Sequence, residues 1–121
     1  MDNDSYSDVT TTVSELKRVA QQFVSDRHWE PYHTPKNLAM STAIEAAELM
    51  ECFQWLTPEE SYQVKNDPEK MIQIGDEIAD VFAYLLNLCS ELDVDLAAEF
   101  VRKSAKNAQK YPLGLDPETN H

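Results

Sequence analysis

Apolar residues recur every three or four positions along most of this chain, which is the spacing of one face of an α-helix. The 121 residues include only 2 glycines, so the turn signals that would separate many short strands are scarce. The pattern therefore predicts an all-α fold built from four long helices and one short helix.

Capping residues and prolines set the expected ends of these helices. Thr12, with Glu15 three residues later, forms a capping-box pattern that begins a helix ending near Arg27. A Thr-Pro or Asp-Pro pair is a similar start signal, because proline suits the first turn of a helix. These signals predict further helices over residues 34–56, from residue 57, over residues 68–91, and from Asp93 or Asp95 to near Pro112.

The chain length fits one domain, residues 1–121, whose small core a partner subunit could complete. Residues 1–8 are polar and residues 113–121 lack periodicity, so both ends are expected to be mobile. Cys52 and Cys89 lie in apolar helical patterns without the spacing of a metal or redox motif, which favours buried free thiols.

Charge and hydropathy exclude several kinds of partner. The formal net charge of −12 argues against binding to a polymeric nucleic acid, because such binding relies on basic side chains. A small phosphorylated substrate held through a metal ion stays possible. The sequence shows neither a run of 18 apolar residues nor a secretory leader, so we expect no membrane contact and a cytoplasmic location.

Two pairs of acidic residues interrupt the two most apolar helices. Glu45 and Glu48 are three positions apart, as are Glu77 and Asp80, so each pair lies on one face of its helix. If the two helices pack side by side, four carboxylates meet, with no Lys or Arg expected in the adjacent core to offset their repulsion. Such all-oxygen donors suit Mg²⁺ or Mn²⁺ better than zinc.

The acid pairs have two other possible interpretations. The acidic stripes could be the solvent faces of ordinary amphipathic helices, as most helical charge rows are. A di-iron helical bundle would need Glu-x-x-His on two helices, and neither Glu45 nor Glu77 is followed by His three residues later.

Basic and aromatic residues add the features of a nucleotide site. Lys103, Asn107 and Lys110 share one face of the last helix, and two cations with an amide suit phosphate oxygens. Their alternative role is to complement the helix dipole at its C-terminus. Lys36, at a helix N-terminus, is a further candidate phosphate contact or a plain surface lysine. Rings near the ends of the second helix could stack on a base or simply fill the core: Trp29, Tyr32, His33 and Trp55.

The acid pairs, separated by 28 residues, resemble the signature of the MazG-like all-α nucleoside triphosphate pyrophosphohydrolases. The surrounding blocks resemble the dCTP pyrophosphatase branch of that family, and the likeness extends over about residues 12–112. The residues that carry it are Arg27, Trp29, His33, Pro35, Lys36, Asn37, Leu38, Glu45, Glu48, Glu51, Phe53, Gln54, Trp55, Glu77, Asp80, Tyr84, Lys103, Asn107, Lys110, Tyr111 and Pro112.

This resemblance implies Mg²⁺-dependent hydrolysis of a nucleoside triphosphate, dCTP first, to the monophosphate and pyrophosphate. It also implies a four-helix-bundle-type fold completed by oligomerisation, as a dimer or a dimer of dimers. The implied metal ligands are Glu45, Glu48, Glu77 and Asp80, and either Glu48 or Glu51 would be the general base.

The resemblance also implies the residues that bind substrate. Lys36 stands where relatives have Arg, a change that keeps the charge but loses the bidentate fork. The implied phosphate or sugar contacts are Lys103, Asn107, Lys110 and Tyr111, and the implied base and sugar pocket consists of Trp29, His33, Trp55 and Tyr84.

Two alternatives to a dCTP pyrophosphatase stay open on the sequence. The protein could hydrolyse oxidised or otherwise modified nucleotides instead of canonical ones. It could also be a non-catalytic helical dimer with a regulatory role, in which the acidic stripes are solvated and metal has no effect.

Overall fold

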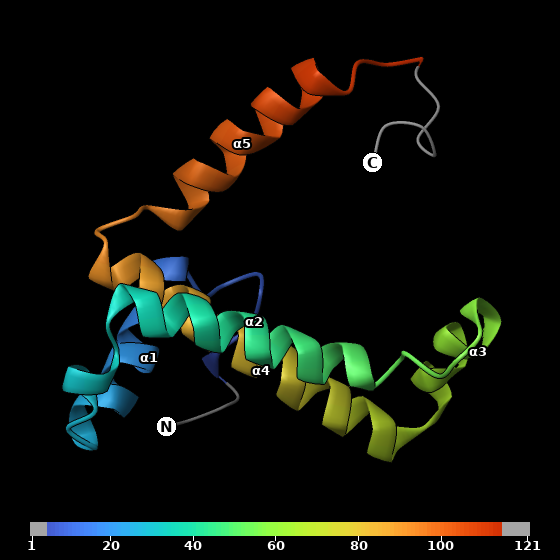
Figure 1. The fold of residues 1–121 in the computed structure, drawn as a ribbon, viewed down its shortest axis with the longest axis horizontal. Coiled ribbons are helices and arrows are strands. Elements are labelled where there is room, and N and C mark those ends of the chain that lie inside the picture. The colour runs from blue at the N-terminus through green and yellow to red at the C-terminus, as the bar shows by residue number, and fades with distance from the viewer. Residues whose placement is uncertain (1–4, 115–121) are drawn as a thin grey trace.

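The computed structural model describes residues 5–114, which form α-helices, short 3-10 helices and turns. The predicted all-α fold is therefore confirmed for this part of the chain. Three long helices pack together and the fourth extends away from them (Figure 1). In chain order the elements are α1 (Val13–Asp26), η2 (Glu30–Tyr32), α2 (Pro35–Glu51), α3 (Pro58–Gln63), η3 (Val64–Asn66), α4 (Pro68–Glu91) and α5 (Leu96–Lys110).

The predicted helix starts are confirmed by their capping bonds. The Thr12 hydroxyl accepts the Glu15 backbone N–H at 3.1 Å, and the Glu15 carboxylate in turn accepts the Thr12 N–H. Thr57 begins α3 with the same reciprocal pair. Asp67 caps α4, whose observed bounds are those predicted. These bonds satisfy N–H groups that lack a partner inside the helix.

The predicted end of α2 is wrong. The helix stops at Glu51, and residues 52–56 form tight turns instead of continuing to Leu56. At the helix end the backbone changes to the tighter i to i−3 pattern, with the Cys52 N–H donating to the Leu49 carbonyl at 3.1 Å. Pro58 acts only on Thr57, because proline disfavours the helical conformation for the residue before it. Thr57 accordingly adopts φ −72° and ψ 162°, and the chain must leave the helix before reaching it.

Other sequence-based expectations need smaller corrections. Of the two predicted caps, Asp95 begins α5, and Asp93 lies in the turn after the end of α4. Cys89 is buried as predicted, but Cys52 is only half-buried. Most of the ends expected to be mobile, residues 1–4 and 115–121, lie outside the described residues. Within the described part, the Ser7 N–H donates to the Thr11 hydroxyl at 2.9 Å.

The core lies between α2 and α4, which pack side by side along their length, with α1 against α4. Leu38 of α2 is only 1% exposed. The buried apolar residues of the described chain are Val24, Leu38, Val64, Ile74, Leu86 and Cys89. Burying these side chains supplies most of the stability of the three-helix unit. No helix within residues 5–114 is long and apolar enough to cross a membrane.

Helix α5 has no extensive packing against the other helices within residues 5–114 (Figure 1). Phe100 and Val101 on this helix are 71% and 68% exposed. The accessible surface of the chain is 9624 Å², compared with about 6600 Å² for a compact monomer of this mass. The four-helix bundle expected from the sequence is therefore not closed within one chain, and its completion by oligomerisation stays a prediction.

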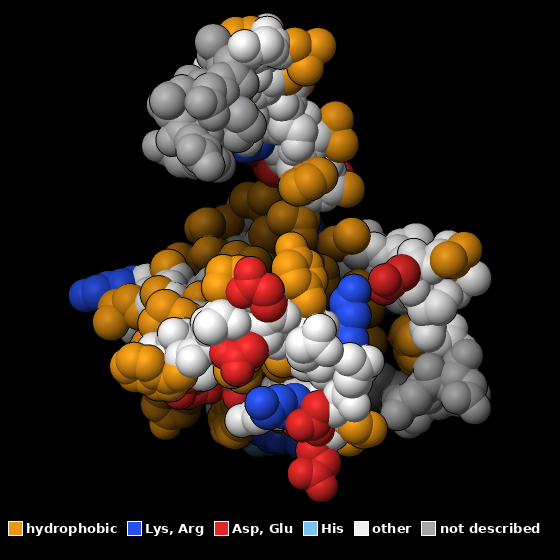
Figure 2. Space-filling model, turned by 90° about the vertical axis from the view of Figure 1, so that its right-hand side faces the viewer, with side chains coloured by type: hydrophobic (Ala, Val, Ile, Leu, Met, Phe, Trp, Pro, Cys, Tyr) orange, Lys and Arg blue, Asp and Glu red, His pale blue; other side chains and the backbone are white. Residues whose placement is uncertain are grey.

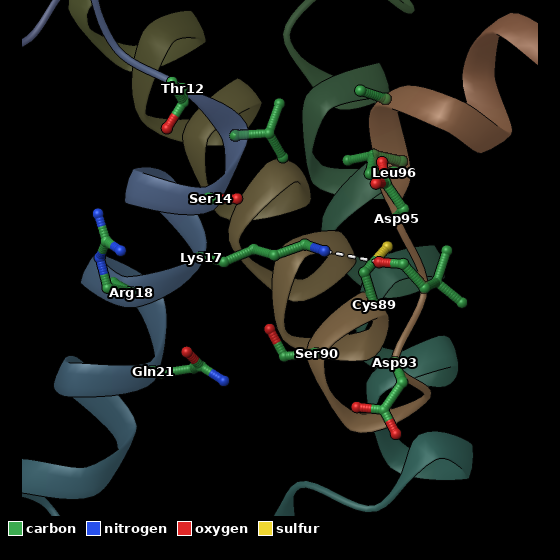
Figure 3. Close-up of a pocket in the computed structure, with 13 residues that line it drawn as sticks. Thr12, Ser14, Lys17, Arg18, Gln21, Cys89, Ser90, Asp93, Asp95 and Leu96 are labelled. Atoms are coloured by element: carbon green, nitrogen blue, oxygen red, sulfur yellow. Dashed lines mark hydrogen bonds between the residues drawn. The ribbon is translucent and has the colours of Figure 1, made fainter.

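The turn between α4 and α5 has a defined geometry. Asp93 has φ 54°, and the Val94 N–H donates to the Cys89 carbonyl at 2.8 Å, as in a Schellman helix end. Lys17 of α1 reaches across the cavity shown in Figure 3 and donates to the Val94 carbonyl at 2.6 Å. This bond ties the start of the α5 segment to α1.

Replacing Lys17 with Met should lower the free energy of unfolding by about 1.5 to 3 kcal/mol, the usual contribution of a hydrogen bond to a charged group. Arg18→Met is the matched control, because it removes the same charge one residue later on the same helix. Urea unfolding followed by circular dichroism measures both variants. Equal stabilities for the two variants would contradict a structural role for the Lys17 bond.

Candidate active site

The packing of α2 against α4 brings the two predicted acid pairs together. Carboxylate oxygens of Glu45, Glu48 and Glu77 all lie within 4.8 Å of one another. We call these three residues the acid cluster. Asp80 lies outside this group of three, but its charge acts on Glu45 and Glu77. The predicted meeting of the pairs is confirmed for three of the four residues, and their role as metal ligands stays a prediction.

Burial and mutual repulsion change the proton affinity of the cluster. The pKa of Glu45 is raised from 4.5 to about 7, first by burial, then by a hydrogen bond with the Glu48 side chain and by the surrounding negative charges. The pKa of Glu77 is also raised, first by burial and then by the charge of Glu48. Both shifts favour the uncharged carboxyl groups, as expected where like charges crowd together without a cation.

The cluster fits a hard divalent cation. Glu45 and Glu77 each have a buried Oε2 atom without a hydrogen-bond partner among the described residues. A buried oxygen in that state is costly unless an ion or water satisfies it. The donors are all carboxylate oxygens, the type that Mg²⁺ and Mn²⁺ prefer. These buried oxygens argue against an acidic stripe that is merely solvated.

A cavity of about 430 Å³ adjoins the acid cluster. It contains the predicted base candidate Glu51, and it shares Glu48 and Glu77 with the cluster. Acidic and basic side chains lie close together among apolar ones on the face of the molecule that carries α3 (Figure 2). The residues that line the cavity are Glu48, Glu51, Cys52, Lys70, Gln73, Ile74 and Glu77.

The sequence analysis missed Lys70 and expected no basic residue beside the acids. Lys70 lies in the first turn of α4, where its N–H is capped by Asp67. It precedes Glu77 by seven residues, which is about two helical turns and the same face. That seven-residue spacing is the feature of the sequence that could have placed Lys70 on the same helix face as Glu77.

An aromatic row leads away from the other side of the acid cluster. The ring centroids of Trp29 and His33 are 6.4 Å apart, and those of His33 and Tyr84 are 6.2 Å apart. The pKa of Tyr84 is raised, first by its own burial and then by the charge of Glu45, so this ring borders the cluster. His33 Nδ1 is buried without a hydrogen-bond partner among the described residues.

The structure does not bring the remaining predicted residues to this site within one chain. Trp55 is 84% exposed, because it follows the end of α2 rather than lying on that helix. Lys36 is exposed in the first turn of α2. The predicted phosphate contacts are exposed on or just after α5, the helix that stands apart: Lys103, Asn107, Lys110 and Tyr111.

Comparisons with known proteins found a matching family, similar sequences and a similar structure. The sequence model of the MazG-like family matches residues 40–120. The dCTP pyrophosphatase 1 proteins of Rattus norvegicus and Homo sapiens are each 33% identical over 104 residues, covering 86% of this chain. The chain spans only 61% of the length of these relatives. The crystal structure of a pyrophosphatase from Archaeoglobus fulgidus superposes with a TM-score of 0.75 at 42% identity, covering 82% of this chain and 91% of that one.

The metal-free protein should lose stability as the pH rises from about 4.5 to about 7. The folded state holds the Glu45 proton more tightly than the unfolded chain does. The contribution of this proton to the free energy of unfolding is therefore complete below pH 4.5 and is lost as the pH passes about 7. Melting temperatures measured in EDTA across this range test the effect. Saturating Mg²⁺ should oppose the loss, because a cation binds the charged carboxylates.

Glu45→Gln should remove most of this pH dependence, because the amide does not titrate. Glu59→Gln, an exposed change on α3, is the control and should keep the wild-type profile. A flat wild-type profile, or one that Glu45→Gln leaves unchanged, would show that Glu45 does not hold a proton in the folded state.

Proposed function

Because the chain belongs to the MazG-like family, we propose that it hydrolyses nucleoside triphosphates to nucleoside monophosphates and pyrophosphate. Relatives named dCTP pyrophosphatase 1 and a solved structure described as a pyrophosphatase support this activity. The observation that carries the proposal is the acid cluster with its two buried, unpartnered oxygens. Clearance of nucleotides from the cytoplasmic pool is the corresponding role.

Glu45, Glu48, Glu77 and Asp80 would hold Mg²⁺, with Mn²⁺ as the alternative. When bound, the cation would offset the triphosphate charge and make a water molecule easier to deprotonate. The protein itself positions the substrate and accepts the proton, as in other phosphoryl transfers.

Glu51 is the better placed of the two general-base candidates. Glu48 belongs to the acid cluster and contacts Glu45, so it would be committed to holding the cation. Glu51 lines the adjoining cavity one helical turn later without being part of that group. A carboxylate in that position could take a proton from water in the cavity, because it would not be bound to the cation.

The aromatic row would bind the base and sugar, with dCTP as the preferred substrate. Trp29 and Tyr84 offer ring faces, and stacking contributes about 1 to 3 kcal/mol per base. Stacking tolerates any base, so preference requires a hydrogen bond to the base or sugar edge. His33 Nδ1 is the unsatisfied polar atom in the row.

A second copy of the chain would complete the site. Lys103, Asn107, Lys110 and Tyr111 belong to α5 or follow it directly, and this helix leads away from the acid cluster of its own chain. Phe100 and Val101 leave an apolar face open on the same helix. A homodimer, or a dimer of two dimers, would cover that face and supply phosphate contacts to the neighbouring chain.

A panel of canonical and modified nucleoside triphosphates with Mg²⁺ tests the activity, with pyrophosphate and phosphate measured separately. Pyrophosphate should be the product, and dCTP should give the highest kcat/KM. Glu48→Gln and Glu77→Gln should each lower kcat by about a hundredfold or more, while Glu59→Gln should not.

Three results would change this proposal. Release of inorganic phosphate would overturn the reaction type. A higher kcat/KM for modified nucleotides than for dCTP would make modified nucleotides the preferred substrates. Near-native turnover by Glu77→Gln with an intact helical circular dichroism spectrum would remove the acid cluster from the chemistry.

Mixing two inactive variants tests whether α5 acts on the neighbouring chain. One variant carries Glu77→Gln, and the other carries Lys103→Met together with Lys110→Met. After the variants are mixed and allowed to exchange chains, about a quarter of the sites in a random population of dimers combine intact acids with an intact α5. Activity should return to about that fraction. No recovery, with chain exchange verified by differently tagged copies, would place both groups in the same chain.

A further inference from the structure

The cavity beside the acid cluster contains a single cationic side chain among its lining residues, and this residue is Lys70. The other charged groups that line the cavity are Glu48, Glu51 and Glu77. Lys70 also lies near Glu60 of α3, and the positive charge of Lys70 acts on the Glu60 carboxylate. A polyanion entering this acidic cavity would be repelled unless a cation meets it there.

The order of groups along α4 gives the site a direction. Glu77 lies about 10 Å from Lys70 and about 10 Å from Tyr84 along the helix axis, because seven residues separate it from each. The aromatic row therefore lies on one side of the acid cluster and Lys70 on the other. Gln73, between Lys70 and Glu77, adds an amide donor on the cavity side.

A nucleoside triphosphate has a matching polarity, with the base at one end and the terminal phosphates at the other. Cleavage to monophosphate and pyrophosphate breaks the bridge between the α- and β-phosphates, so this bridge would lie at the acid cluster. If the base occupies the aromatic row, the β- and γ-phosphates extend into the cavity that contains Lys70. An ammonium group suits phosphate oxygens as a compact, flexible donor.

We propose that Lys70 binds the β- and γ-phosphates of the substrate, the pair that leaves as pyrophosphate. This inference rests on the proposed function, since it uses the base and the bond cleaved to orient the substrate. It assigns a binding role to a residue of α4 that lies outside both the acid pairs and α5.

Calorimetry with inorganic pyrophosphate and Mg²⁺ tests this role without turnover. Lys70→Met should weaken pyrophosphate binding about tenfold, the effect of losing one charge-assisted hydrogen bond at a partly exposed site. Lys70→Arg should retain most of the binding. Lys65→Met is the control, because Lys65 is an exposed lysine of η3 that does not line the cavity. The affinity for dCMP should be unchanged in all three variants.

Steady-state kinetics gives a second measurement on the same proteins. Lys70→Met should raise KM for the triphosphate about tenfold, and it should raise the inhibition constant of pyrophosphate by a similar factor. Lys65→Met should change neither value.

The outcomes separate this inference from the proposed function. Equal pyrophosphate affinities for Lys70→Met and Lys65→Met would overturn the role of Lys70 even if the wild type hydrolyses dCTP. Equal losses of pyrophosphate and dCMP binding would also overturn it, because Lys70 would then not select the terminal phosphates. A wild type that hydrolyses no triphosphate, but binds pyrophosphate through Lys70, would support the phosphate site and overturn the proposed reaction.

Discussion

Repulsion between carboxylates held together by two packed helices is the constraint on which the rest of the structure depends. The acid cluster lies between α2 and α4, the two helices that share the core of the chain. The core fixes the helices, so the acids cannot separate to relieve their repulsion. The raised pKa values of Glu45 and Glu77 show that the metal-free cluster tends to retain protons. A divalent cation removes both the repulsion and the need for those protons.

The arrangement around the cluster follows from the antiparallel course of α2 and α4. The aromatic row approaches from the start of α2 through His33, whereas Glu51 and Lys70 gather where α2 ends and α4 begins. The proposed base-binding end and the proposed phosphate-binding end are thus separated by the acids. Helix α5 lies outside this arrangement, and its exposed apolar residues support completion by a second copy. The Lys17 bond to the Val94 carbonyl is the contact that holds the start of this segment.

Local signals explain how much could be predicted from the sequence. The bounds of α4 follow from the Asp67 cap, Pro68 and a long apolar pattern, and the meeting of the acid pairs follows from their spacing on helices that must bury their other faces. The end of α2 was missed because Phe53 and Leu56 continue the helical periodicity beyond Glu51, where the backbone changes from helix to turns.

Long-range contacts explain what could not be predicted. Lys17 and Val94 are 77 residues apart in sequence, so the bond that anchors the α4–α5 turn is not visible in any local pattern. Lys70 was overlooked because a lysine in a capped first turn is usually a surface residue. Trp55 was expected in the base pocket, but its exposure depends on the early end of α2.

Calorimetric titration of the metal-free protein with Mg²⁺ tests the central claim, that the acid cluster is a cation site, most directly. At about pH 6, Glu45 is mostly protonated, so binding should release close to one proton. Titration in two buffers with different ionisation enthalpies measures that number. The account predicts binding with proton release in the wild type, binding with little proton release in Glu45→Gln, and a large loss of affinity in Glu77→Gln. Undetectable Mg²⁺ and Mn²⁺ binding by the wild type, or equal affinity in Glu77→Gln, would contradict it.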